Sequence, residues 1–252
     1  MVNNLVYGFH SVEALLKNKP ESIEVVYIDD ERQDKRLQVL VGLINDAGLK
    51  INLTRGASLD KISAGARHQG VIAVINTDDS SSLPSLTLKQ LLDGVSVKEN
   101  SIVIVLDGVT DPHNLGAIIR TCDCFGVDAV IIPKDNSANI NATVAKTSAG
   151  AVNYVPVIIV NNLARTLEEL KESGYWIAGA TLAEGSVDLF GFVPDKKIVW
   201  VMGSEDKGIR RLVAEGCDYL VSIPMQGHTQ SLNVSVASGV VLSYTRYSLR
   251  DK

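Results

Sequence analysis

Ile102-Val103-Ile104-Val105-Leu106 is an unbroken aliphatic run near the middle of the chain. Such a run is typical of a parallel strand whose two faces are both buried. The polar segment Asp111-Pro112-His113-Asn114 follows it, and from Leu115 onward apolar residues recur at helical spacing. The pattern therefore predicts a strand followed by a helix, which is the repeating unit of α/β folds.

The same alternation continues towards the C-terminus. Further strands are expected at 129–132, 154–159, 176–180, 198–202 and 219–223, and further helices at 142–149, 163–173, 209–215 and 232–249. Strands and helices that alternate at this spacing predict an α/β domain with a mostly parallel sheet covered on both faces.

A polar, Ser-rich stretch at 78–85 separates a smaller N-terminal unit from this domain. In the smaller unit the pattern predicts helices at 11–17, capped by Ser11, and at 35–47, ended by Gly48. Strands are expected at 23–28, 50–54 and 70–75. We therefore predict a small α/β domain at residues 1–77, a linker at 78–99 and a larger domain at 100–252.

Charge and cysteine content narrow the class of protein. The net charge is −5 and no basic tail is present, which disfavours binding of nucleic acid through bulk charge. Any nucleic-acid site must then be a local patch. The three cysteines argue against a disulfide framework, and the histidines show no metal-ligand spacing. No apolar run is as long as a transmembrane helix, and no signal-peptide pattern is seen, so we expect a cytoplasmic protein.

Three polar clusters follow strands of the larger domain. They run from Asn114 to Arg120, from Met202 to Gly208 and from Ile223 to Ala237. Open α/β sheets bind ligands at the carboxyl ends of their strands, so the three clusters are expected to converge on one crevice.

Each cluster also has an ordinary structural interpretation. Asn114 suits a helix N-cap, and Arg120 lies opposite the apolar stripe as a plain surface charge. Glu205 is an acidic residue near a helix start, while Ser231 and Asn233 suit the cap of the last helix. Any one cluster taken alone is explained by these roles.

Several common nucleotide and hydrolase sites are disfavoured by missing motifs. No strand is followed by the GxGxxG pattern of dinucleotide-binding folds, so a dehydrogenase remains only the second choice at the level of the fold. Ile209 and Arg210 stand where a Walker A loop needs Lys and Ser or Thr. A GxSxG elbow of serine hydrolases is absent as well.

Taken in order, the three clusters resemble the three motifs of the SpoU/TrmH class of SPOUT methyltransferases. The matching residues are Asn114-x-Gly-Ala-x-x-Arg120, Gly203-Ser-Glu205-x-x-Gly208 and Ile223-Pro-Met-x-Gly…Ser231-Leu-Asn233-Val-Ser-Val-Ala. The segments Tyr7-Gly-Phe-His-Ser-Val-Glu-Ala-Leu and Arg67-His-Gln-Gly-Val-Ile-Ala look like the RlmB-type members of the class. The resemblance thus covers essentially the whole chain, although Asp206 stands where many relatives have glycine.

The resemblance implies a SPOUT fold with a C-terminal deep trefoil knot, preceded by a small L30e-like RNA-binding domain. It also implies a homodimer that transfers a methyl group from S-adenosylmethionine to a ribose 2′-hydroxyl of RNA, without a metal or a membrane. Matching the motifs assigns the donor to Gly203, Ile223, Met225 and Leu232, and the reacting ribose to Asn114, Arg120, Glu205, Ser231 and Asn233.

Our hypothesis for the chemistry gives Arg120 the central role. An arginine stays protonated up to about pH 12, so we expect Arg120 to bind the target phosphate and favour the alkoxide rather than act as a base. Glu205 is expected to position Arg120. The substrate expected first is a guanosine of large-subunit ribosomal RNA; the alternatives are a tRNA ribose, or a non-catalytic RNA-binding or ribosome-assembly factor with the same fold.

Overall fold

The computed structural model describes residues 5–18, 20–32, 34–63, 65, 68–75, 86–95, 98–204, 206–229 and 231–250. The chain divides into two compact units. The first consists of residues 1–84 together with 140–154, and the second of residues 85–139 together with 155–252. The division into 1–77, 78–99 and 100–252 stays a prediction.

The first unit contains a mixed four-stranded sheet in the order β1-β4-β2-β3, in which β4 is antiparallel to β1 and β2, and β2 is parallel to β3. Its elements are β1 Leu5–Tyr7, α1 Phe9–Asn18, β2 Ile23–Asp29, α2 Lys35–Asp46, β3 Ile51–Thr54, α3 Gly56–Ile62, β4 Val71–Ile75 and the later α6 Ala142–Thr147.

Helix α1 begins earlier than the sequence indicated. Ser11 was expected to cap it, but α1 starts at Phe9 and Ser11 is buried inside it. The reason is a contact that is distant in sequence, because the side chain of Gln69 accepts a hydrogen bond from the Phe9 N–H at 3.1 Å. The end of α2 is as expected, since Gly48 follows it with a positive φ of 66°.

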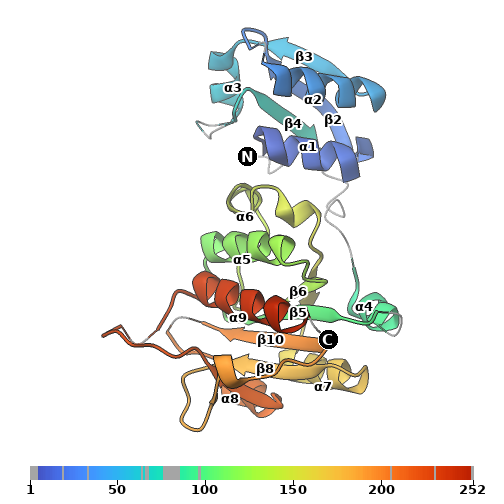
Figure 1. The fold of residues 1–252 in the computed structure, drawn as a ribbon. Helices are drawn as coiled ribbons and strands as arrows, with labels where there is room; N and C mark the ends of the chain where they lie inside the picture. The colour runs from blue at the N-terminus through green and yellow to red at the C-terminus, as the bar shows by residue number, and fades with distance from the viewer. Residues whose placement is uncertain are drawn as a thin grey trace. The chain divides into compact units, whose positions relative to one another are not determined.

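The second unit contains a seven-stranded sheet in the order β7-β6-β5-β10-β8-β11-β9, and every pairing within it is parallel. Figure 1 labels the longer strands of this sheet and colours them in chain order. Its strands are β5 Ser101–Asp107, β6 Ala129–Pro133, β7 Val157–Val160, β8 Trp176–Ala180, β9 Val187–Asp188, β10 Lys197–Gly203 and β11 Tyr219–Ser222. Its helices are α4 Leu88–Val95, α5 Pro112–Cys124, α7 Leu163–Glu172, α8 Arg211–Glu215 and α9 Val234–Ser248.

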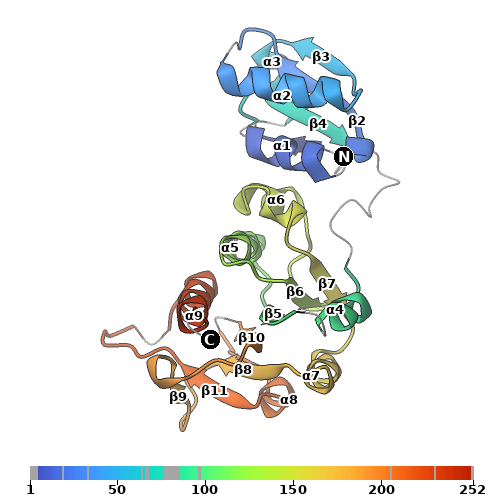
Figure 2. The same cartoon turned by 45° about the vertical axis from the view of Figure 1, so that its right-hand side comes forward.

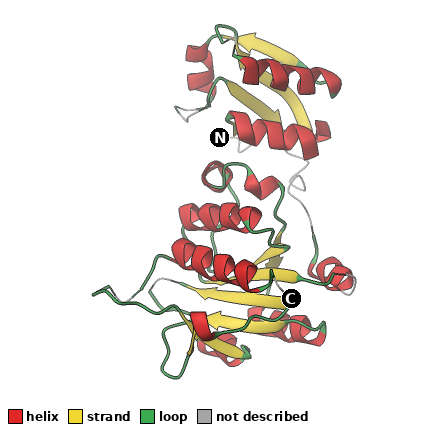
Figure 3. Cartoon of the chain, viewed as in Figure 1, coloured by secondary structure: helices red, strands yellow, loops and turns green. Residues whose placement is uncertain are grey.

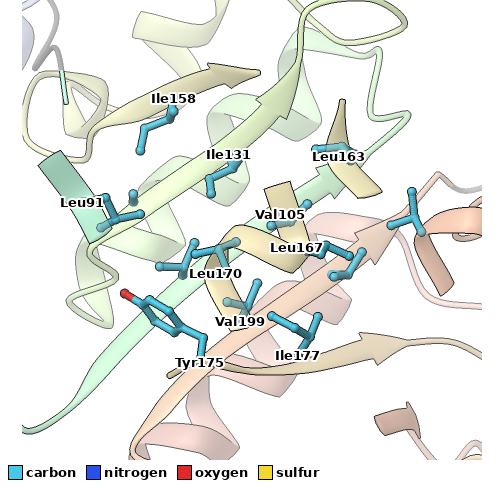
Figure 4. Packing of buried hydrophobic residues seen from close by; sticks show 14 residues of the cluster. Leu91, Val105, Ile131, Ile158, Leu163, Leu167, Leu170, Tyr175, Ile177 and Val199 are labelled. Carbon is cyan, nitrogen blue, oxygen red and sulfur yellow. The ribbon is translucent and has the colours of Figure 1, made fainter. Parts of the chain in front are cut away.

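Helices cover both faces of this sheet, as Figures 2 and 3 show. On one face, α4, α7 and α8 bury Leu91, Leu167 and Val213 against alternate residues of the strands. Figure 4 shows Leu91 and Leu167 in this cluster. On the other face, α5 and α9 lie side by side, and α9 is fixed to β10 by a buried hydrogen bond from Trp200 Nε1 to Thr245 Oγ1 at 2.9 Å. The expected α/β fold with a mostly parallel sheet is confirmed.

Local differences from the expectation have packing explanations. Helix α4 lies in the stretch predicted as a linker, and it buries Leu91 in the core cluster with Leu88 and Leu92 packed beside it. Strand β7 begins at Val157 rather than at residue 154, because Ala151–Asn153 form a 3-10 helix. No helix among the described residues is long and apolar enough to cross a membrane.

Candidate functional site

The second and third sequence clusters meet at the carboxyl ends of β8, β10 and β11. Between them lies a cavity of about 290 Å³, called cavity A. It is lined by residues of 180–183, 202–204, 221–225 and 231–237 together with Gly208. Gly203, Ile223, Met225 and Leu232, the residues matched to a donor site, all line it, and so does Ser231.

The loop after β10 closes on itself at one wall of cavity A. Ser204 N–H donates to the Gly208 carbonyl at 3.1 Å, and Gly208 N–H donates to the Ser204 carbonyl at 2.9 Å. Gly203 lies against this turn so closely that a Cβ at its position would stand 2.2 Å from the carbonyl carbon of Gly208. A glycine is therefore required at 203 because two backbone segments touch there.

The first cluster meets the third at a second cavity of about 410 Å³, called cavity B. Asn114 lines this cavity, and Asn233 Nδ2 donates a hydrogen bond to Asn114 Oδ1 at 3.0 Å. Cavities A and B share Ser204, Gly208 and Val234 in their walls. A ligand in cavity A would thus be separated by only a few residues from a ligand held beside the two asparagines.

Asn114 is not the helix cap that the sequence suggested. Asp111 caps α5, since its side chain accepts the His113 N–H at 2.8 Å, and Pro112 is the first helical residue. The Asn114 side chain is therefore available for the contact with Asn233. Asn233 does cap α9, because its Oδ1 accepts the Ser235 N–H at 2.9 Å.

The structure does not bring all predicted residues together. Arg120 is exposed on α5, lines neither cavity, and has no hydrogen bond or ion pair with a described residue. Ser231 lines cavity A rather than the cavity that holds Asn114. Glu205 lies outside the described residues, so its expected contact with Arg120 stays a prediction.

Sequence reasoning missed one charged pair at this site. Asp107 is the last residue of β5, its side chain is fully buried, and it lines cavity B. Arg210 donates to it twice, from its backbone N–H at 2.8 Å and from Nε at 2.6 Å. The signal was an acidic residue placed directly after an aliphatic strand, at the edge where such sheets bind ligands.

The cysteines lie outside both cavities and are all free. Burial raises the pKa of the Cys217 thiol to about 12 and also raises the pKa of Cys122, so both stay protonated at neutral pH. Within the part of the chain that the structure describes, no group of His, Cys, Asp and Glu side chains is arranged to hold a metal ion.

Two family models match the chain. The SpoU rRNA methylase family matches residues 101–243, and the model described as RNA 2′-O ribose methyltransferase substrate binding matches residues 5–80. The first match contains all three sequence clusters and both cavities, while the second contains the sheet of the N-terminal unit.

Individual relatives agree with the family models. The chain is 46% identical over 241 residues to the 23S rRNA (guanosine-2′-O-)-methyltransferase RlmB of Neisseria meningitidis, covering 96% of this chain and 94% of that protein. It is 43% identical over 244 residues to the protein of the same name from Escherichia coli, covering 96% and 97%. A solved rRNA methyltransferase of Sinorhizobium meliloti, bound to AdoMet, has the same fold with a TM-score of 0.77 at 22% identity, covering 98% and 87%. The chain therefore belongs to the SpoU rRNA methylase family.

Proposed function

We propose that this protein transfers a methyl group from S-adenosylmethionine to the ribose 2′-hydroxyl of a guanosine in 23S ribosomal RNA. The observation that carries the proposal is the shared wall of cavities A and B, with the donor-matched residues lining A and Asn114, which is hydrogen-bonded to Asn233, lining B. The near full-length similarity to 23S rRNA guanosine-2′-O-methyltransferases supports the choice of substrate.

Cavity A fits the donor in size and chemistry. Its volume of about 290 Å³ is close to the lower end of the roughly 300–1,000 Å³ range of small-molecule sites. Its described lining has no charged side chain and combines Leu182, Ile223 and Leu232 with the backbone at Gly203 and Gly208. Apolar walls and exposed backbone groups suit a flat nucleoside, which stacks on its faces and is recognised at its edges.

The bound donor supplies an already activated methyl group, so the protein has mainly to align the acceptor oxygen with it. In the proposed reaction the 2′-oxygen forms a bond to the methyl carbon, the carbon–sulfur bond breaks to leave S-adenosylhomocysteine, and the hydroxyl proton passes to solvent. Asn114 holds the ribose in cavity B, with its amide oxygen fixed by the Asn233 amide, and Ser231 lines the adjoining cavity A. Holding the reacting atoms in line lowers the activation free energy of methyl transfer by a large part.

Arg120 still binds the target phosphate in our proposal, but it does so at the site of a second copy of the chain. It is exposed on α5, the helix that lies beside α9. On α9, Val236 and Tyr247 are 51% and 70% exposed, with Val240 and Ser243 between them at helical spacing. We propose that this α5/α9 face forms the interface of a homodimer, and that Arg120 binds the phosphate of the target nucleotide there.

The dimer is tested by placing charge on that face. Val236→Glu is expected to raise the dimer dissociation constant by about 100-fold or more, because a two-fold interface sets the new charge near its own copy and like charges cost several kcal/mol. Sedimentation velocity measures the change. Leu212→Glu is the matched control, since Leu212 is 61% exposed on α8 on the other face of the sheet. If both variants sediment like the parent protein, the interface lies elsewhere.

Three further features belong to the proposal. We propose a deep trefoil knot in the C-terminal part, consistent with the close approach of the loops after β8, β10 and β11 around cavity A. We propose that residues 1–77 form an L30e-like domain that selects the RNA, in line with the family model at 5–80. We also propose that the protein acts in the cytoplasm, where ribosomal RNA is found.

The decisive experiment is transfer of labelled methyl from S-adenosylmethionine to ribosomal RNA and tRNA, offered separately from cells that lack this protein. Label in 23S RNA that survives alkaline hydrolysis as a resistant dinucleotide is the expected result. Label in tRNA alone would mean that the protein is a ribose methyltransferase whose substrate is tRNA instead of 23S RNA. Donor binding without label in any RNA or ribosomal particle would instead indicate a non-catalytic assembly factor.

A further inference from the structure

Asp107 holds Arg210 by both of its carboxylate oxygens. The Asp107 side chain has no exposed surface, and buried carboxylates persist only where they are hydrogen-bonded and paired. Oδ2 accepts the backbone N–H of Arg210, while Oδ1 accepts Nε. The pair joins β5 to the segment just after Gly208, so Arg210 is fixed both at its backbone and at the inner edge of its guanidinium.

The outer edge of the same guanidinium is free for a ligand. The Arg210 side chain is 55% exposed, and its two Nη groups have no partner among the described residues. Other arginines of this unit are bound differently. Arg165 and Arg211 each pair with a glutamate four residues along their own helix, at 77% and 79% exposure. Arg210 is instead held by the buried carboxylate of Asp107, which belongs to a different element.

A third cavity begins where Arg210 stands. Cavity C, of about 580 Å³, lies at the carboxyl ends of β6 and β7. Cavities B and C adjoin, since they share Asn136 and Arg210 in their walls, and the two together are called the B/C groove. Asn161 and Asn162 add polar groups to the far wall of cavity C.

The groove carries acidic as well as basic groups, so a polyanion needs a local anchor. Asp135 lies in the wall of cavity C together with Arg211, which is paired with Glu215, and Asp111 and Asp206 lie in the wall of cavity B together with Lys207. These carboxylates repel phosphates, and the whole chain is acidic at −5. A guanidinium that is held in place, with both Nη groups unpaired among the described residues, is the group best suited to a phosphate because it can donate twice.

We propose that cavity C binds the RNA backbone adjacent to the methylated nucleotide, and that Arg210, positioned by Asp107, binds the phosphate at the junction of cavities B and C. The inference rests on the proposed function, since it takes the target ribose to lie beside Asn114. The asparagines of cavity C then face the neighbouring nucleotide, which makes the groove a determinant of the sequence around the target.

The test compares Arg210→Gln with Arg165→Gln, using RNA that the parent enzyme methylates. Arg210→Gln is expected to weaken RNA binding about tenfold. One lost phosphate contact also lowers the slope of log K against log salt by about 0.7 in magnitude for single-stranded RNA. KM for RNA should rise more than kcat falls, while donor affinity stays within about twofold. Arg165→Gln should leave the RNA affinity, the salt slope, KM, kcat and the donor affinity at the parent values.

Two further variants separate binding from stability. Arg210→Lys keeps the positive charge but loses the planar guanidinium with its paired donors. It should therefore restore the salt slope and only part of the affinity for RNA. Asp107→Asn should raise KM while keeping the slope, because the cation stays but is no longer positioned. An unchanged slope and KM in Arg210→Gln overturns the inference. So does a parallel loss of melting temperature and donor affinity in both Arg210 variants. If the parent enzyme methylates no RNA, it is the proposed function that fails.

Discussion

Gly203→Ala is expected to abolish donor binding, lowering the affinity for S-adenosylmethionine by at least about 100-fold. The added Cβ would stand 2.2 Å from the carbonyl carbon of Gly208 and 2.4 Å from the Ile209 nitrogen. These are backbone atoms, which cannot rotate away as a side chain can. Relief requires the Ser204–Gly208 turn to open, and both of those residues line cavity A. Isothermal titration with the donor measures the loss directly.

Gly191→Ala provides the control for this experiment. A Cβ at Gly191 meets no atom within 4 Å, so the same chemical change at that position should leave donor affinity and melting temperature unchanged. Near-parental donor affinity in Gly203→Ala would contradict the placement of the donor in cavity A. A variant that stays folded by circular dichroism but binds no donor would support it.

Asn114→Ala is expected to lower kcat/KM for methyl transfer by about 100-fold or more, because the ribose loses one of the two amides that hold it in line. Donor affinity should stay within about twofold, since Asn114 lines cavity B and not cavity A. The neighbouring His113 is exposed and lines neither cavity, so His113→Ala should keep the parent rate. Single-turnover kinetics with saturating donor gives the comparison.

The hydrogen bond between Asn233 and Asn114 makes a sharper version of this prediction possible. Asn233→Ser keeps a side chain that can cap α9 but removes the amide that donates to Asn114. If the two asparagines act as one unit, each single variant and the double variant should lose similar amounts of kcat/KM. Losses that multiply in the double variant would mean that the two amides act independently, against the proposed arrangement.

Much of the fold could be predicted because its signals are local. The aliphatic run at 102–106 and its successors gave a parallel α/β sheet, and the structure places β5, β8 and β10 within one or two residues of those runs. Helix α4 was missed because its residues were assigned to the linker at 78–99, although Leu88, Leu91, Leu92 and Val95 follow the helical spacing i, i+3, i+4 and i+7. The start of α1 was wrong because its cap comes from Gln69, which is distant in sequence.

For the candidate site, the sequence identified sets of residues but not which of them lie next to one another in the fold. It placed Gly203, Ile223, Met225 and Leu232 in one set, and the tertiary structure gathers them around one cavity. It also grouped Arg120 with Asn114. Six residues along a helix, however, correspond to about 9 Å of rise and about 120° of rotation. Arg120 therefore leaves the cavity that Asn114 lines.

The sequence by itself determined the α/β alternation, the family and the three motifs, because these depend on residue type and on short spacings. The tertiary structure alone decided that Asn114 meets Asn233, that Gly203 touches Gly208, and that Asp107 holds Arg210 between two cavities. Asn114 and Asn233 lie 119 residues apart, and Asp107 and Arg210 lie 103 apart. Contacts over such separations follow from the order of strands in the sheet, which sets β10 beside β5, and no local pattern encodes that order.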